Sequence, residues 1–241
     1  QELLPDLKFF SSQDIPSDFF RTFVWWPWDK LLRRQFITSH QLRFQEIRTT
    51  NDLFFVCAFM LMANRISVLN ETLISHTINR SESLSATRAE SHRCAVEALV
   101  ALKAFICQQG MMEHRLRDYK NYVVVFLEWH LNTISGPAFH PFYQQVKEFV
   151  VALDAKSDDF YDEFIAAAHH RITTLSAEEY LFSLKDRVLK ELEFFQARSS
   201  ALQQEVETLT HSFAGQKDEN AILHNQLHEI EERVTEQEQN I

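Results

Sequence analysis

The stretch LQQEVETLTHSFAGQKDENAIL, residues 202–223, places apolar residues at alternating spacings of three and four, which is the repeat of a coiled-coil helix. The alternation runs from Leu192 to the last residue, Ile241. A repeat sustained beyond about three or four heptads predicts a coiled coil. With Leu192 at an a position, the apolar seam consists of Leu202, Val206, Leu209, Phe213, Leu223, Leu227, Ile230 and Val234.

Three amide side chains interrupt this seam as polar layers, namely Gln216, Asn220 and Gln237. A polar residue in the seam weakens pairing, but it penalises every register or stoichiometry that leaves its amide without a partner. Gln216 and Asn220 are therefore predicted to select a partner at the cost of stability. The alternative is that both are tolerated defects in a marginal coil.

The repeat also predicts that the helix needs a second helix. At about 1.5 Å rise per residue, residues 192–241 span about 75 Å, which is too long for the stripe to be covered by a small bundle. The covering helix comes from a second copy, from a different protein or from parts of this chain outside the sequence.

The charges beside the seam leave that choice open. In a parallel dimer Arg233 faces Glu238 and Glu219 faces His224, whereas Glu205 faces only Thr210. These contacts do not enforce a homodimer, so both self-pairing and pairing with a heterologous helix stay open.

The heptad run with Gln216 near its centre resembles the coiled-coil motif of SNARE proteins, in which one Gln or Arg layer interrupts a long apolar repeat. It is also similar in outline to SNARE-mimicking bacterial effectors, which carry such coils beside unrelated helical domains. The resemblance covers residues 192–241 and implies a role in membrane traffic through pairing with vesicle coils.

The composition of the chain favours helices, and its distribution of charges argues against electrostatic binding to nucleic acid. The chain contains only three glycines and five prolines among 241 residues, which argues against the many tight turns of a β-protein. Residues 154–241 carry 8 Lys/Arg against 19 Asp/Glu, a net charge of −11, so the chain has no basic stripe for nucleic acid. We therefore expect no nucleic-acid partner.

Cysteine usage and hydropathy bear on localisation. Cys57, Cys94 and Cys107 are far apart and form no CxxC, which favours a reducing, cytoplasmic compartment. The apolar run at residues 53–63 is shorter than the roughly 20 residues of a spanning helix. Because the sequence ends within the repeat, we expect a fragment whose missing ends are candidates for a membrane anchor.

The residues before the coil predict a bundle of six or seven helices over residues 1–175, followed by one long helix over 176–241. Predicted helices cover residues 28–48 and an apolar segment that Asn51-Asp52 caps and that continues to Ile78. Gly110 closes the next predicted helix, and Gly136-Pro137 ends the one over residues 111–134. Another opens at Pro141, a further one is capped by residues 157–159, and Ser176 with Glu179 forms a capping box. Residues 79–85 are predicted to form a turn.

An aromatic and basic cluster lies near the N-terminus in the stretch FVWWPWDKLLRR, residues 23–34. Aromatic rings beside cations are typical of a protein hot spot or a membrane interface. The alternative is that the indoles cap one end of the bundle. The candidate residues for a partner or peripheral membrane surface are Trp25, Trp26, Trp28, Lys30, Arg33 and Arg34.

Catalytic and metal motifs are not apparent. Asp158, Asp159, Asp162 and Glu163 precede His169 and His170, but the chain has no HExxH or ExxH pair. His224 and His228 are four residues apart on the coil, at positions that face water. We expect no metal and no cofactor. The sequence thus predicts an all-α, non-catalytic interaction or scaffold module, with an enzyme whose site lies in the bundle as the alternative.

Overall fold

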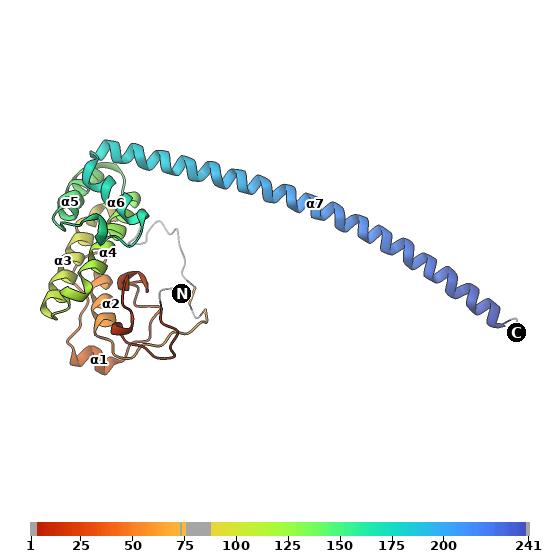
Figure 1. Ribbon diagram of the computed structural model, residues 1–241, viewed down its shortest axis with the longest axis horizontal. Coiled ribbons are helices and arrows are strands. Elements are labelled where there is room, and N and C mark those ends of the chain that lie inside the picture. The colour runs from red at the N-terminus through yellow and green to blue at the C-terminus, as the bar shows by residue number, and fades with distance from the viewer. Residues whose placement is uncertain (1–3, 73, 76–87, 240–241) are drawn as a thin grey trace. The chain divides into compact units, whose positions relative to one another are not determined.

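The computed structural model describes residues 4–72, 74–75 and 88–239 and confirms an all-α fold for them. An isolated antiparallel bridge between Phe10 and Ile66 is the one β-type contact within these ranges. The chain divides into two compact units, Gln1–Leu181 and Phe182–Ile241. Figure 1 draws the helices of both units.

The first unit is a helical bundle preceded by an irregular, Phe-rich lead. Its helices are α1 (Arg34–Ser39), α2 (Asn51–Met62), α3 (Arg93–Gln108), α4 (Met112–Thr133), α5 (Phe139–Val151) and α6 (Glu163–Thr174). Short 3-10 turns occur at Ser12–Asp14, Phe19–Arg21, Arg88–Ser91, Gly136–Ala138 and Ser157–Asp159.

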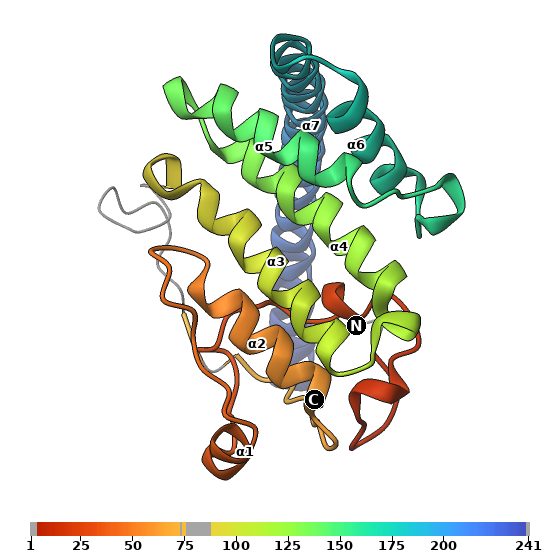
Figure 2. The same ribbon diagram turned by 90° about the vertical axis from the view of Figure 1, so that its left-hand side faces the viewer.

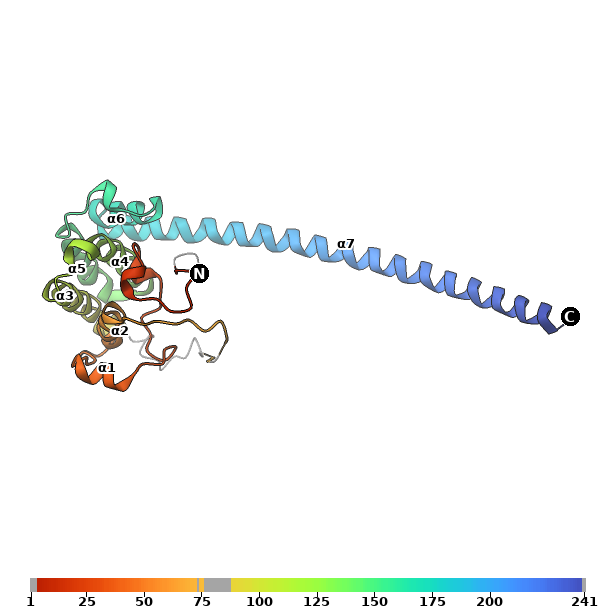
Figure 3. The ribbon, with the colours of Figure 1, turned by 60° about the horizontal axis from the view of Figure 1, so that its bottom comes forward.

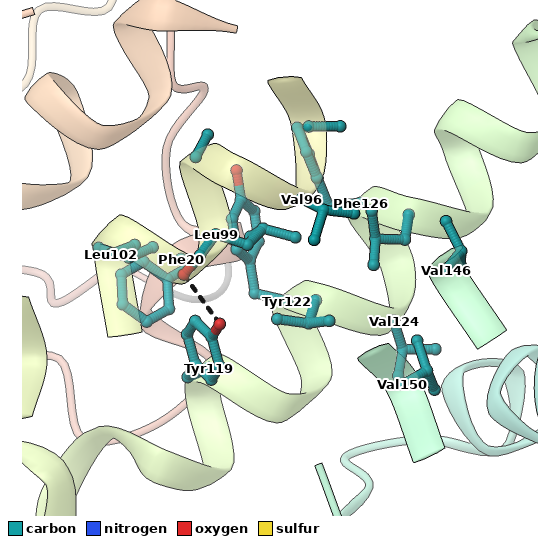
Figure 4. Packing of buried hydrophobic residues seen from close by; sticks show 14 of the residues in the cluster. Phe20, Val96, Leu99, Leu102, Tyr119, Tyr122, Val124, Phe126, Val146 and Val150 are labelled. Atoms are coloured by element: carbon teal, nitrogen blue, oxygen red, sulfur yellow. Dashed lines mark hydrogen bonds between the residues drawn. The ribbon is translucent and has the colours of Figure 1, made fainter. Parts of the chain in front are cut away.

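Helix α4 lies at the centre of this bundle and contacts α3, α5 and α6, while α2 packs on α3 (Figure 2). Val123, Val124 and Leu127 on α4 are fully buried, so apolar neighbours cover more than one of its faces. Figure 4 shows Leu99 and Leu102 of α3 and Val146 and Val150 of α5 in the core that surrounds it. Burial of this surface is the main stabilising contribution to the bundle.

Sequence signals that act locally are confirmed. Gly110 follows α3 with φ +68°, and Gly136 follows α4 with φ +71°, the left-handed conformation that glycine adopts at little cost. Helix α4 matches the prediction for residues 111–134 within one residue, and α5 begins two residues before Pro141.

The predicted helix over residues 28–48 is wrong for most of its length, because only α1 is helical there. Before α1, Lys30 Nζ donates to the carbonyl oxygen of Trp26 at 2.9 Å and to that of Val24, so this side chain binds the irregular segment that precedes the helix. Gln41, with φ 53°, then ends the helical region.

The predicted continuation of the second helix through Ile66 and Leu69 is also wrong. After Ala63 the chain is extended, and Ile66 N donates to Phe10 O at 2.6 Å while Phe10 N donates to Ile66 O at 3.0 Å. Pairing with the lead, a long-range contact, replaces the helical hydrogen bonds.

Two predicted helix caps are corrected. Thr50, with φ 61°, is the N-cap of α2 in place of Asn51 and Asp52, and it makes no side-chain cap bond. Asp162 caps α6 by accepting from Ile165 N at 2.8 Å, whereas residues 157–159 form a separate 3-10 turn. Leu73, Ile78 and the predicted turn at 79–85 lie outside the described residues.

The long predicted helix is present as α7, Ala177–Gln239, with 63 residues. Figures 1 and 3 draw it as one continuous ribbon. Its first residues, through Leu181, belong to the bundle unit, where Tyr180 is fully buried and donates to Asn132 Oδ1 at 2.9 Å. The remainder forms the second unit.

Candidate helix-pairing surface

Helix α7 begins at the predicted capping box. Ser176 N donates to Glu179 Oε2 at 2.7 Å, and Glu179 N donates to Ser176 Oγ at 3.1 Å, so each residue satisfies an amide of the other. From Ala177 to Gln239 the sequence contains one glycine, Gly215, and no proline. Nothing in the local sequence therefore forces the helix to end.

The apolar seam is exposed along the described part of the second unit. Phe213 has the largest exposed fraction, 72%, and Leu202 the smallest, 50%. Between these values lie Val206, Leu209, Leu223, Leu227 and Ile230. These seven side chains form an exposed apolar row along α7.

The polar layers Gln216 and Asn220 are exposed on the same helix. Because residues four apart lie on one face of an α-helix, the two amides are neighbours within the seam. In the seam, Phe213 precedes Gln216 and Leu223 follows Asn220, so an apolar layer lies on either side of the two amides. Val234 and Gln237 lie within the helical backbone of α7.

The centre of the helix combines several weak helix formers. Gly215 has open space where a Cβ would lie, so packing does not require a glycine there. Thr208 Oγ1 donates to Gln204 O at 2.8 Å, and Thr210 Oγ1 donates to Val206 O at 2.7 Å. Such back-bonding weakens a helix slightly, so the centre of α7 depends on packing for its stability.

Exposed apolar residues also precede the predicted seam, and the sequence analysis missed them. Val188 and Phe182 are 53% and 68% exposed, and Leu189 and Phe194 are exposed too. Val188 lies four residues before Leu192, so the alternation of three and four already extended to it. That spacing was the signal that would have found it.

The tryptophan segment of the first unit is divided between core and surface. Trp25 packs edge-to-face on Phe126, with ring centroids 5.7 Å apart, and adjoins the main core. Trp26 and Trp28 stack on each other at 4.8 Å, and Trp28 is 39% exposed.

The basic residues of this segment separate as well. Lys30 is mostly buried and, besides the two carbonyl oxygens, binds Asp29 Oδ1 at 2.6 Å. Arg33 and Arg34 are exposed, and Leu31, which precedes them, is fully exposed. A cationic contribution from this segment to a partner or membrane surface thus falls to the two arginines.

The acidic residues near His169 have structural partners. Asp159 Oδ2 accepts from Lys120 Nζ at 2.8 Å, and Asp162 Oδ2 accepts from Arg21 Nη1 at 3.1 Å in addition to capping α6. Burial, and then the neighbouring His170, lower the pKa of His169. Among the described residues, no three His, Cys, Asp or Glu side chains form a group that could hold a metal ion.

No helix of the described ranges is both long enough and apolar enough to cross a membrane. Comparison of the chain with protein-family models, with curated proteins and with solved structures found no match.

Proposed function

We propose that this chain is a non-catalytic interaction module whose α7 pairs with another helix through the seam. The carrying observation is the row of exposed apolar side chains from Leu202 to Ile230. Burying a Leu, Val, Ile or Phe side chain stabilises by about 1.5–3 kcal/mol, and a coiled coil buries such a row against a partner helix.

Helix length supports the same proposal. An isolated helix in water gains little from propensity, and most helices of proteins are stabilised by packing one apolar face. Helix α7 has 63 residues and only its first few belong to the bundle unit. Helix α7 therefore needs a partner helix for its stability.

The polar layers give the proposed pairing its selectivity. Once buried, the amides of Gln216 and Asn220 need hydrogen-bond partners, so a register that places them against apolar side chains is penalised. The bundle acts as the folded module that α7 tethers to its partner.

The narrower functional predictions depend on sequence alone. The SNARE-like resemblance and its implied role in membrane traffic concern only residues 192–241. The alternative of an enzyme with a site in the bundle also stays a prediction.

Two adjacent residues provide a matched test of the proposal. Leu223 belongs to the seam, whereas Ile222 lies at a c position on the opposite side, and their exposed fractions are 61% and 58%. Leu223→Glu should reduce the assembly of the full chain in analytical ultracentrifugation and its helicity in circular dichroism, because it buries a charge in the seam. Ile222→Glu should leave both unchanged.

The proposal is contradicted if the two variants behave alike. It is also contradicted by a wild-type chain that sediments as a single copy while the amides of α7 remain protected from hydrogen exchange. Such a helix would be stable without any partner.

A further inference from the structure

The seam of α7 is symmetric about Asp218. Gln216 and Asn220 lie two residues to either side of it, and the polar positions Ser199 and Gln237 lie nineteen residues to either side. The apolar positions match in the same way: Phe213 mirrors Leu223, and Val206 mirrors Ile230. Between residues 199 and 237, every polar seam position thus mirrors a polar one and every apolar position an apolar one.

A second copy of the same helix in the opposite direction matches this symmetry. Reversing one helix brings its a positions opposite the d positions of the other. In a two-fold interface each contact occurs twice, since residue i of one copy contacts residue j of the other and the reverse also holds. We propose that α7 pairs with α7 of a second copy in antiparallel orientation, with the two-fold axis at Asp218. Gln216 then faces Asn220 of the second copy, and each amide gains a partner that can both donate and accept.

The charge of the two halves of the helix favours this direction. Residues 199–217 carry Lys217 against Glu205 and Glu207, a net charge of −1, whereas residues 219–237 carry Arg233 against five Glu, a net charge of −4. A parallel dimer places the two −4 halves side by side. The antiparallel dimer places each −4 half beside a −1 half, which lowers the repulsion between the helices.

The charge contacts beside the seam include both attractive and repulsive pairs in the antiparallel dimer. In the antiparallel dimer Glu205 faces Arg233 of the second copy, but Lys217 and Glu219 each face their own counterpart near the axis. Both of these side chains are exposed, so dissolved salt screens each like-charge contact within a Debye length of about 8 Å. In a parallel dimer in register, each layer pairs with itself, so polar residues also meet polar residues there. The mirror symmetry therefore permits the antiparallel direction, and the charge of the halves favours it over the parallel one.

Cross-linking between variants of the full chain that each carry one engineered, exposed cysteine tests the direction. All variants carry Cys107→Ser, because Cys107 is the exposed cysteine of the chain, whereas Cys57 and Cys94 are buried. One variant adds Val206→Cys and the other adds Ile230→Cys, with an affinity tag on one of them. The two are mixed, unfolded, refolded together and treated with a short thiol-to-thiol reagent.

The expected result is a cross-linked pair that contains one chain of each variant. Neither variant alone should cross-link, because residues 206 of the two copies lie about 36 Å apart in the antiparallel dimer. Leu223→Cys, one heptad away from Ile230, replaces the second variant as a register control and should not cross-link to Val206→Cys.

The inference rests on the proposed function, and its failure is distinguishable from failure of that function. Cross-linking of each variant with itself shows a parallel dimer and overturns only the direction. A single-copy chain whose α7 amides exchange rapidly overturns self-pairing but leaves a helix that needs a different partner. A single-copy chain with a protected α7 overturns both.

Discussion

Arg115 Nη1 on α4 donates a hydrogen bond of 2.9 Å to the carbonyl oxygen of Ile15, which lies 100 residues earlier in the chain. The same guanidinium forms an ion pair of 2.9 Å with Asp118, and both side chains are almost completely buried. Asp118 in turn accepts from the amide of Asp18 at 2.6 Å and from the hydroxyl of Tyr161. This network fixes the irregular N-terminal lead on the central helix.

Replacement of Arg115 should therefore destabilise the bundle strongly. Arg115→Met leaves the buried carboxylate of Asp118 without its cation, a change that costs about 3–5 kcal/mol in comparable buried pairs. The free energy of unfolding from urea titration measures it. Arg48→Met is the matched control, since the ion pair between Arg48 and Glu90 is more than half exposed, and it should cost about 1 kcal/mol or less.

Stability should fall on mild acidification because of His130. Burial lowers the pKa of His130 from its usual 6.5 to about 4, and its Nδ1 lies 3.0 Å from the carbonyl oxygen of Phe126. Since the folded-state pKa is the lower one, the unfolded chain binds the extra proton between these values. Stability is thus complete above pH 6.5 and is lost as the pH falls toward 4, by up to about 3 kcal/mol.

Urea titrations at a series of pH values measure this loss. His130→Gln should remove most of the slope between pH 6.5 and 4, whereas His114→Gln, at an exposed position on the same helix, should retain it. An unchanged slope in His130→Gln would show that other groups cause the acid sensitivity.

Two glycines should respond to alanine in opposite directions, although neither has an atom within 4 Å of an added Cβ. Gly110 adopts φ +68°, so Gly110→Ala forces a left-handed alanine and should destabilise the bundle by about 1 kcal/mol. Gly215 lies inside α7 with an ordinary helical conformation, and Gly215→Ala should stabilise that helix by about 0.5–1 kcal/mol. Hydrogen exchange of the two units measures each effect separately, and effects of the same sign would contradict the conformational explanation.

Replacing the two amides of the seam by apolar residues should raise the stability of the assembly and lower its selectivity for one register. The double variant Gln216→Leu, Asn220→Leu makes adjacent layers apolar, so the thermal midpoint of α7 should rise and the assembly should populate more than one register or stoichiometry. Circular dichroism and sedimentation measure the two effects. A lower midpoint with a single stoichiometry would show that the amides contribute stability and not selectivity.

Local signals explain which elements could be predicted from the sequence. The capping box at Ser176 and Glu179, the glycines at 110 and 136, and the heptad spacing after Leu192 all act between residues a few positions apart. Their geometry follows from backbone conformation and from the period of the helix, so they are readable without knowledge of the rest of the fold.

The errors occurred where long-range partners competed with helix formation. Residues 28–48 have a helical pattern, but only Arg34–Ser39 is helical, and Leu42 beyond it is buried in one apolar cluster with Phe55 and Val56 of α2. Ile66 continues an apolar periodicity, yet it pairs with Phe10, a residue 56 positions earlier. Such contacts depend on the arrangement of the whole bundle, which tertiary packing decides.

The sequence by itself determined that this chain is helical, that α7 is long and that its seam is apolar with amides near the centre. These properties follow from spacing along one helix. Only the tertiary structure decided that residues 64–72 after α2 are not helical, that Trp25 is partly buried and Lys30 mostly buried, and that Arg115 joins Ile15 to α4. The physical reason is that burial and long-range hydrogen bonds are set by which segments meet in the folded chain, and periodicity within one segment does not specify its neighbours.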